Sequence, residues 1–195
     1  MPDERIAVPV GLQDIYYAKL TKDDSTGVAY ATPKLMAPAI TAKVTPSVNS
    51  ATLFGNDGPV ITANALGEIQ VEIGVTSISL ETQADILGST IVDGMLIDNA
   101  DDNAPEVALG YKRTMHDGSV VYVWLLKGKF SLPSDEATTK QGTPEYQTPT
   151  ITGAFLKRLF DGNWRFRADS ADPAAAARIA TWFTSVPSAP VIPNP

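Results

Sequence analysis

The sequence contains no cysteine among its 195 residues. Disulfide bonds and thiolate metal sites are therefore excluded, and the fold must be held by packing alone. Long apolar runs are also missing, since no stretch approaches the roughly 20 residues that a membrane-spanning helix needs. The start, with Asp3 and Glu4, lacks the basic and apolar regions of a secretory signal. These absences predict a soluble protein that is made in a cytoplasm and has no membrane partner.

Positive charge is scarce as well. The 15 Lys and Arg residues stand against 22 Asp and Glu residues, which gives a formal net charge of -7. That sign disfavours tight binding of nucleic acid, which depends on neutralising phosphates. The 44% hydrophobic and 19% charged residues are typical of a globular chain. We expect one domain over residues 1–186 and a Pro-rich tail over 187–195.

Enzyme motifs are missing too. The single histidine, His116, falls in an expected turn, and no Gly-x-Ser-x-Gly nucleophile motif occurs in the chain. Gly128 and Lys129 have no glycine-rich phosphate loop before them. We therefore expect a protein that is not an enzyme and holds no cofactor.

Two residue sets have both a ligand-binding and a structural interpretation. Asp98, Asp101 and Asp102 supply carboxylate oxygens, but their spacing does not match a calcium loop, so a solvated turn is favoured and no metal site is expected. The tryptophans could form a stacking platform for sugars or bases. Each lies in an apolar run, however, where core packing is the ordinary outcome; they are Trp124, Trp164 and Trp182.

Strict apolar/polar alternation predicts two strands, over residues 40–45 and 68–76. Such strands have one dry and one wet face. The connection between them, residues 46–67, is far longer than a usual hairpin loop, and its polar sequence predicts an irregular excursion. We expect this long loop to contact a neighbouring copy of the chain.

The remaining pattern predicts a mainly β protein, a two-sheet β-sandwich or barrel with one or two short helices. An extended arm is expected over 1–11, with Ile6, Val8 and Val10 exposed for docking. Further strands are expected over 12–20, 28–36 and 91–97, with hairpins pairing 106–115 with 119–130 and 150–159 with 164–168. A helix over 79–88 should bury Leu80, Ala84 and Leu87, and a helix over 173–186 should bury Ala176, Ile179 and Phe183.

Glu68, Gln70 and Glu72 occupy alternate positions of the second predicted strand. Spacing alone favours the solvated face of a strand. The functional interpretation is an acidic wall that faces a channel, which requires a closed ring of copies. Assembly distinguishes the two interpretations.

Several segments together resemble the major tail proteins of long-tailed phages, which form the tail tube. They are residues 10–18, 50–59, 66–69, 108–112, 122–130 and 145–151. The resemblance extends over about residues 10–169. It does not include the extra immunoglobulin-like domain that some relatives carry at the C-terminus.

The resemblance implies a β-sandwich subunit that forms hexameric rings, which stack into a tube that conducts genomic DNA into the host. It places the protein in the virion tail, assembled in the bacterial host cytoplasm, with tape-measure, tail-terminator and baseplate proteins as partners and double-stranded DNA passing without tight binding. Glu68, Gln70 and Glu72 would then face the lumen. The inter-subunit loop would use Asn49, Thr52, Leu53, Phe54, Asn56, Asp57, Val60, Asn64 and Leu66.

Two alternatives stay open at this point. The chain could build the tube of a headless, tail-like bacterial particle, which has the same fold. It could instead be a monomeric β-sandwich module that binds carbohydrate or a host surface, which predicts exposed aromatic side chains and a ligand-dependent gain in stability.

Overall fold

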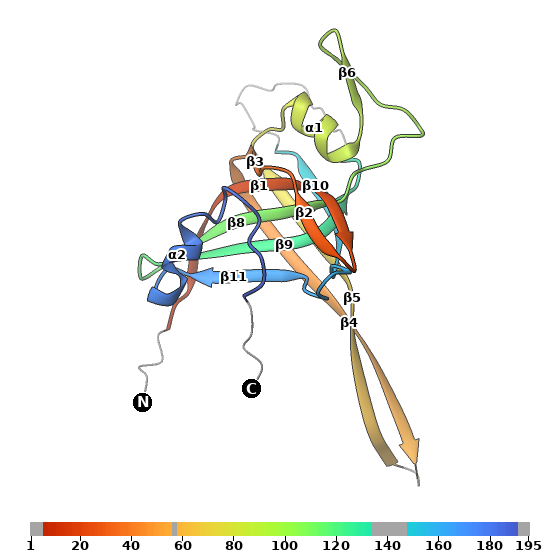
Figure 1. Cartoon of the computed structure of the whole chain (residues 1–195), viewed down its shortest axis with the longest axis vertical. Coiled ribbons are helices and arrows are strands. Elements are labelled where there is room, and N and C mark those ends of the chain that lie inside the picture. The colour runs from red at the N-terminus through yellow and green to blue at the C-terminus, as the bar shows by residue number, and fades with distance from the viewer. Residues whose placement is uncertain (1–5, 56–57, 134–147, 191–195) are drawn as a thin grey trace, which may run out of the picture.

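A computed structural model describes residues 6–55, 58–133 and 148–190. In this part of the chain one antiparallel nine-stranded sheet runs in the order β2-β1-β8-β9-β10-β5-β4, with β3 also paired to β1 and β11 to β9 (Figure 1). A small separate sheet pairs β6 with β7. The strands are β1 (Pro9–Asp24), β2 (Gly27–Tyr30), β3 (Lys34–Ala37), β4 (Ala39–Gly55), β5 (Gly58–Val75), β6 (Thr90–Val92), β7 (Met95–Ile97), β8 (Val107–Met115), β9 (Val120–Phe130), β10 (Thr150–Leu156) and β11 (Arg165–Asp169).

The helices are α1 (Leu80–Leu87), a 3-10 turn (Pro173–Ala175) and α2 (Ala176–Ile179). The predicted fold class, mainly β with short helices in a sandwich-like arrangement, is confirmed. No helix of the described residues is long and apolar enough to cross a membrane.

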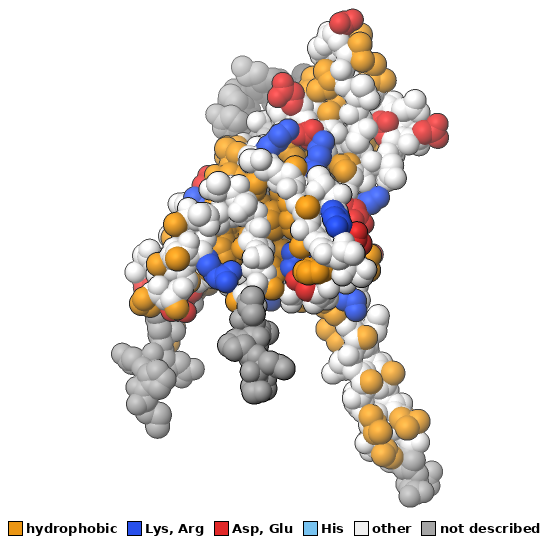
Figure 2. All heavy atoms as spheres, in the orientation of Figure 1, with side chains coloured by type: hydrophobic (Ala, Val, Ile, Leu, Met, Phe, Trp, Pro, Cys, Tyr) orange, Lys and Arg blue, Asp and Glu red, His pale blue; other side chains and the backbone are white. Residues whose placement is uncertain are grey.

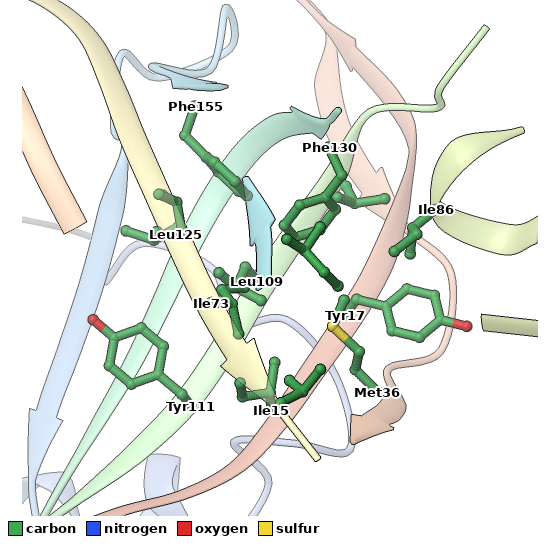
Figure 3. Packing of buried hydrophobic residues seen from close by; sticks show 14 of the residues in the cluster. Ile15, Tyr17, Met36, Ile73, Ile86, Leu109, Tyr111, Leu125, Phe130 and Phe155 are labelled. Atoms are coloured by element: carbon green, nitrogen blue, oxygen red, sulfur yellow. The ribbon is translucent and has the colours of Figure 1, made fainter. Parts of the chain in front are cut away.

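The main core lies on the concave side of the large sheet, where side chains of β1, β5, β8, β9 and β10 meet (Figure 3). The alternation predicted for β5 places Ile69, Val71 and Ile73 in this core, each at most 1% exposed. Burying an aliphatic side chain of this size stabilises the fold by roughly 1.5–3 kcal/mol. Gly128 of β9 lies directly under the ring of Phe155, where no side chain would fit.

A second apolar cluster covers the opposite, convex face of the same sheet. Trp124 of β9 is fully buried there, and its Nε1 donates a hydrogen bond of 2.8 Å to the carbonyl oxygen of Trp182. The ring of Phe183 stacks on Tyr16 with centroids 4.3 Å apart. Trp124 and Trp182 thus follow their core interpretation, and Trp164 packs partly buried against the main core.

Helix α1 begins and ends as its sequence predicts. The hydroxyl of Ser79 accepts a hydrogen bond from the amide of Thr82, and Gly88 ends the helix in the left-handed region at φ 86°. Its buried face was predicted only in part: Leu87 is buried as expected, but Leu80 is 48% exposed, and Thr82 and Ile86 are buried instead. The short helix meets the sheet on the side that carries Ile86 (Figure 3).

Three other strand and helix predictions were wrong in detail. Residues 91–97 form a small hairpin, β6 and β7, because Asp93 and Gly94 both adopt positive φ and turn the chain. Strands β10 and β11 do not pair with each other; both pair with β9, β10 along its end and β11 along its start. The helix predicted over 173–186 stops at Ile179, and successive turns then bring Trp182 and Phe183 onto the convex face. The hairpin of β8 and β9 is confirmed.

Candidate assembly surfaces

The connection over residues 46–67 is regular, contrary to the irregular loop that its sequence predicted. Strands β4 and β5 stay paired far beyond the body of the protein, up to Gly55 opposite Gly58 (Figure 1). We call residues 48–66 the arm. Alternation did not reveal it because both faces of the arm are exposed to solvent, so neither face needs to be uniformly apolar. The sequence signal for the hairpin was Asp57 followed by Gly58.

A bulge separates the arm from the body. The ladder shifts between Pro46 and Val48, because proline has no N–H to donate and two residues of β5 face one of β4. The hydroxyl of Ser47 donates a hydrogen bond of 2.6 Å to the carbonyl oxygen of Glu68 at this point. The bulge therefore gives the arm a defined base.

The two faces of the arm differ in chemistry, as its register shows. Residues directly opposite each other in an antiparallel pair point to the same face. One face, which we call the apolar face, carries Leu53 opposite Ile61 and Ala51 opposite Ala63. The other, the hydroxyl face, carries the pairs Ser50 with Asn64 and Thr52 with Thr62, whose side-chain oxygens lie 2.8 Å and 3.4 Å apart.

Large apolar side chains crowd the outer half of the arm and have nothing packed on them (Figure 2). Leu53 is 63% exposed, Phe54 69%, Val60 61% and Ile61 59%. The described residues of the arm include no charged side chain. A two-stranded ribbon with such exposed apolar groups is typical of a surface that another protein covers.

The residues predicted for the inter-subunit loop lie on this arm. Asn49, Thr52, Leu53, Phe54, Val60, Asn64 and Leu66 are distributed over both of its strands. Asn56 and Asp57 lie outside the described residues. The arm brings the aliphatic members of the set together at its outer half, whereas Leu66 lies near its base opposite Val48.

Glu68, Gln70 and Glu72 all lie exposed on the outward side of β5, opposite in direction to the buried Ile69 and Val71. This outward side is not uniformly acidic. The Nζ of Lys43 on β4 lies 3.5 Å from a carboxylate oxygen of Glu72. Thr45 and Ala154 flank Gln70 on the two neighbouring strands. The predicted acidic wall is therefore a mixed polar face in one subunit.

The N-terminal segment was predicted as an extended arm over residues 1–11; residues 1–5 lie outside the described residues, and the rest of the segment is attached to the body. Val10 already belongs to β1, which pairs with β8 from Pro9 onward. Val8 is held by His116, whose backbone amide donates to the Val8 carbonyl at 2.9 Å and whose Nδ1 accepts from the Val8 amide at 3.2 Å. Ile6 is 80% exposed. His116 thus holds the segment that leads into β1, in addition to its place in the turn between β8 and β9.

The acidic turn at residues 98–102 is held by hydrogen bonds to its side chains. Asp98 accepts a hydrogen bond from Ser89 and Asp102 accepts one from the amide of Asn99. Within the described ranges, no group of three or more potential ligands is arranged to hold a metal ion. The solvated-turn interpretation fits this geometry.

Asp85 fastens α1 to the sheet. Its carboxylate accepts hydrogen bonds from Lys19 at 2.7 Å, from the Tyr17 hydroxyl at 2.8 Å and from Lys34. Partial burial alone would raise the pKa of Asp85, but the bonds from Lys19, Lys34 and Tyr17 outweigh it and lower that pKa to about 2. Burial, reinforced by Asp85, raises the pKa of the Tyr17 hydroxyl.

A second buried polar group fixes the loop after β10. Asp23, whose side chain is 2% exposed, accepts hydrogen bonds from the amides of Leu159 and Phe160 and from Lys127. Burial would raise its pKa, but the Leu159 amide and Lys127 together lower it. Sequence patterns did not reveal this role, because Asp23 lies at the polar end of β1, where the sequence alone predicts only a turn.

Arg158 lies beside this loop and is 1% exposed. Its guanidinium pairs with Asp161, with Nε 3.0 Å from Oδ1, and lies over the ring of Phe166. The same group contacts the Tyr30 hydroxyl at 3.3 Å. These contacts attach the loop to the sheet, while Leu159 is 71% exposed to solvent.

Comparison with known proteins found no family model that matches this sequence and no curated protein that matches it.

Proposed function

We propose that this chain is the structural subunit of a phage tail tube, which self-assembles into stacked hexameric rings whose lumen conducts genomic DNA. The observation that carries this proposal is the arm: a preformed ribbon that extends away from the body and exposes Leu53, Phe54, Val60 and Ile61. Exposure of this kind is costly in a monomer and is relieved when a second copy covers the surface.

A contact between two different surfaces fits a ring or a tube. The arm projects from one end of the molecule, and we infer that it docks on a different part of a second copy and not on that copy's own arm. Contacts between two different surfaces are heterologous, and they generate rings or helical filaments. The hexameric ring, the stacking of rings, and the tape-measure, tail-terminator and baseplate proteins as partners are inferred from the resemblance to tail tube proteins.

The outward side of β5 is the proposed lumen wall. Glu68 is exposed and has no cationic partner among the described residues, and Gln70 and Glu72 extend the same row. A polar wall without free cationic side chains on β5 lets DNA pass without binding tightly. The same features also fit the tube of a headless, tail-like particle, which has the same fold but conducts no genomic DNA.

Electron microscopy of the purified full chain across a concentration series tests the proposal. Rings or hollow tubes with a constant outer diameter are expected above a threshold concentration. Uniform particles of monomer size at every concentration would contradict the proposal and favour a monomeric binding module.

A further inference from the structure

Three arginines share one face of the large sheet. In β11, Arg165 pairs with Leu125 and Arg167 pairs with Val123 of β9. In β8, Arg113 pairs with Val121 on the other side of β9. Since directly paired residues share a face, all three side chains lie on the concave side that carries Leu125 and Val123. We call Arg113, Arg165 and Arg167 the arginine cluster.

None of the ion pairs among the described residues involves a member of the arginine cluster. The Nε of Arg113 is buried without a hydrogen-bond partner. Burial, and then the like charges of Arg167 and Arg113, lower the pKa of Arg165. Three arginines without an ion pair to any described residue, in a chain of net charge -7, indicate a site for an anion.

The cluster is accessible at an edge of the sheet. Strand β11 pairs only with β9, so its other edge is open among the described strands. Arg167 is exposed, Arg165 and Arg113 are half-buried, and the Arg165 guanidinium stacks over Trp164 with its carbon 4.2 Å from the ring centroid. Stacking of this kind holds a guanidinium in a fixed orientation while it leaves the N–H groups free for an anion.

The opposite charge is concentrated elsewhere in the chain. Residues 77–104, which form α1, β6, β7 and the following turn, contain six of the acidic residues and no Lys, Arg or His: Glu81, Asp85, Asp93, Asp98, Asp101 and Asp102. Asp85 is neutralised by Lys19 and Lys34, whereas the other five are exposed. We call these five residues the acidic end; it lies at the end of the molecule opposite to the arm (Figures 1 and 2).

We propose that the arginine cluster of one subunit binds the acidic end of a second copy of this chain. The contact joins two different surfaces, so it repeats from copy to copy, and it rests on the proposed tube function for its setting. The charge segregation favours this occupant over DNA. The arginines lie on the concave side of the sheet, whereas Glu68 and Glu72 lie on the outward side, so DNA that passes along the outward side does not meet them.

The test is a charge swap between two variants. Variant one carries Arg165→Glu and Arg167→Glu, and variant two carries Asp101→Lys and Asp102→Lys. Each variant alone sets like charges against each other at the contact. In a mixture, the glutamates of variant one can meet the lysines of variant two, and the unchanged arginines of variant two can meet the unchanged acidic end of variant one. Arg178→Glu, an exposed arginine outside the cluster, is the matched control. Circular dichroism verifies that every variant is folded. Asp101 and Asp102 lie in an exposed turn, so variant two should fold and still tests the contact if variant one does not fold.

Assembly is followed by sedimentation and electron microscopy at low and high salt. We expect each variant alone to assemble only at a concentration at least tenfold higher than wild type. The mixture should bring this threshold concentration at least halfway back to the wild-type value. Arg178→Glu should behave as wild type. Normal assembly of either folded variant alone would overturn the inference, and so would a loss of assembly that mixing the two variants does not restore. Neither result would contradict the proposed tube function. Loss of binding to a 20-base-pair DNA at low salt, with assembly unchanged, would also overturn it in favour of a phosphate site.

Failure of the proposed function gives a different result. Salt-sensitive open oligomers that never close into rings or tubes would remove the tube function and leave the contact in place, provided that the swap restored them. A wild-type chain that stays monomeric at every concentration would contradict both.

Discussion

Ser50 and Asn64 are joined across the arm by a hydrogen bond of 2.8 Å between the Ser50 hydroxyl and the Asn64 amide oxygen. The two residues are also directly paired in the backbone ladder. The arm therefore has its shape, and its two different faces, before it meets a partner. A surface that is ordered in advance loses less conformational entropy on docking, which favours assembly.

The apolar face of the arm should carry the contact between copies. Replacing Leu53 and Ile61 by Thr keeps β-forming side chains but removes aliphatic surface. We expect the threshold concentration for assembly to rise more than tenfold, because roughly 1–2 kcal/mol of apolar burial is lost for each copy. Light scattering against concentration measures this threshold. The matched control, Thr52→Val with Thr62→Val on the hydroxyl face, should assemble at least as well; equal effects on both faces would refute the assignment.

The ion pairs of Asp85 should make stability depend on pH. The folded-state pKa of Asp85 is about 2, below its ordinary value of 3.8, so its contribution is complete above about pH 4 and is lost as the pH falls through 2. Asp85→Asn should cost on the order of 1 kcal/mol at neutral pH after solvent screening, and should flatten the acid limb of stability. Urea unfolding at several pH values gives the curve. Asp101→Asn, at an exposed site, should leave it unchanged.

The buried carboxylate of Asp23 should be among the most sensitive polar sites. Asp23→Ala leaves the Leu159 and Phe160 amides without their acceptor and separates Lys127 from its nearest carboxylate. We expect a loss of about 3 kcal/mol in unfolding free energy. The neighbouring change Asp24→Ala, at an exposed residue, should cost much less than Asp23→Ala. Similar costs for the two, measured by urea unfolding, would show that the loop after β10 does not depend on Asp23.

Gly128 should tolerate no side chain. A Cβ at this position would overlap the ring of Phe155, which is itself 1% exposed and cannot move outward. Gly128→Ala is therefore expected to destabilise the fold by about 1–3 kcal/mol through overpacking. Thermal unfolding of this variant beside Gly58→Ala, where nothing lies within 4 Å of the added carbon, isolates the steric effect. An unchanged melting temperature for Gly128→Ala would contradict the packing described for β9 and β10.

The proposed lumen wall can be probed at Glu68. Glu68→Lys should leave stability within about 0.5 kcal/mol, because the side chain is exposed. Assembled tubes of the variant should retain DNA fragments at low salt, since each copy now adds a cation to the wall. Co-sedimentation of short DNA with the tubes measures this. Asp24→Lys, at the exposed end of β1, is the control for charge elsewhere; DNA retention equal to that of Glu68→Lys would remove Glu68 from the lumen.

The sequence predicted the parts of the fold that local chemistry determines. The Ser79 and Gly88 caps of α1, the hairpin around His116 and the alternation that buries Ile69, Val71 and Ile73 each depend on neighbours within a few residues. The pairing of β10 and β11 with β9 was missed, because proximity in sequence favours a hairpin and only tertiary packing selects the shared partner.

The candidate surfaces were only partly predictable for the same reason. Periodicity placed Glu68 on an outward face, but it could not show that Lys43 on the neighbouring strand partly neutralises Glu72. The arginine cluster depends on β8 and β11 flanking β9, which no local pattern indicates. The absence of Lys and Arg from residues 77–104 can be read from the sequence, but only the fold shows that this stretch lies at the end opposite to the arm.

The most direct measurement of the central claim places a reporter on the arm. Because the chain has no cysteine, Leu53→Cys and Thr52→Cys each give a single site for a polarity-sensitive dye, on the apolar and the hydroxyl face respectively. As rings or tubes form with rising concentration, the dye at position 53 should shift its emission to the blue while the dye at position 52 changes much less. Emission typical of water at position 53 in fully assembled particles would contradict the claim that the arm joins one copy to the next.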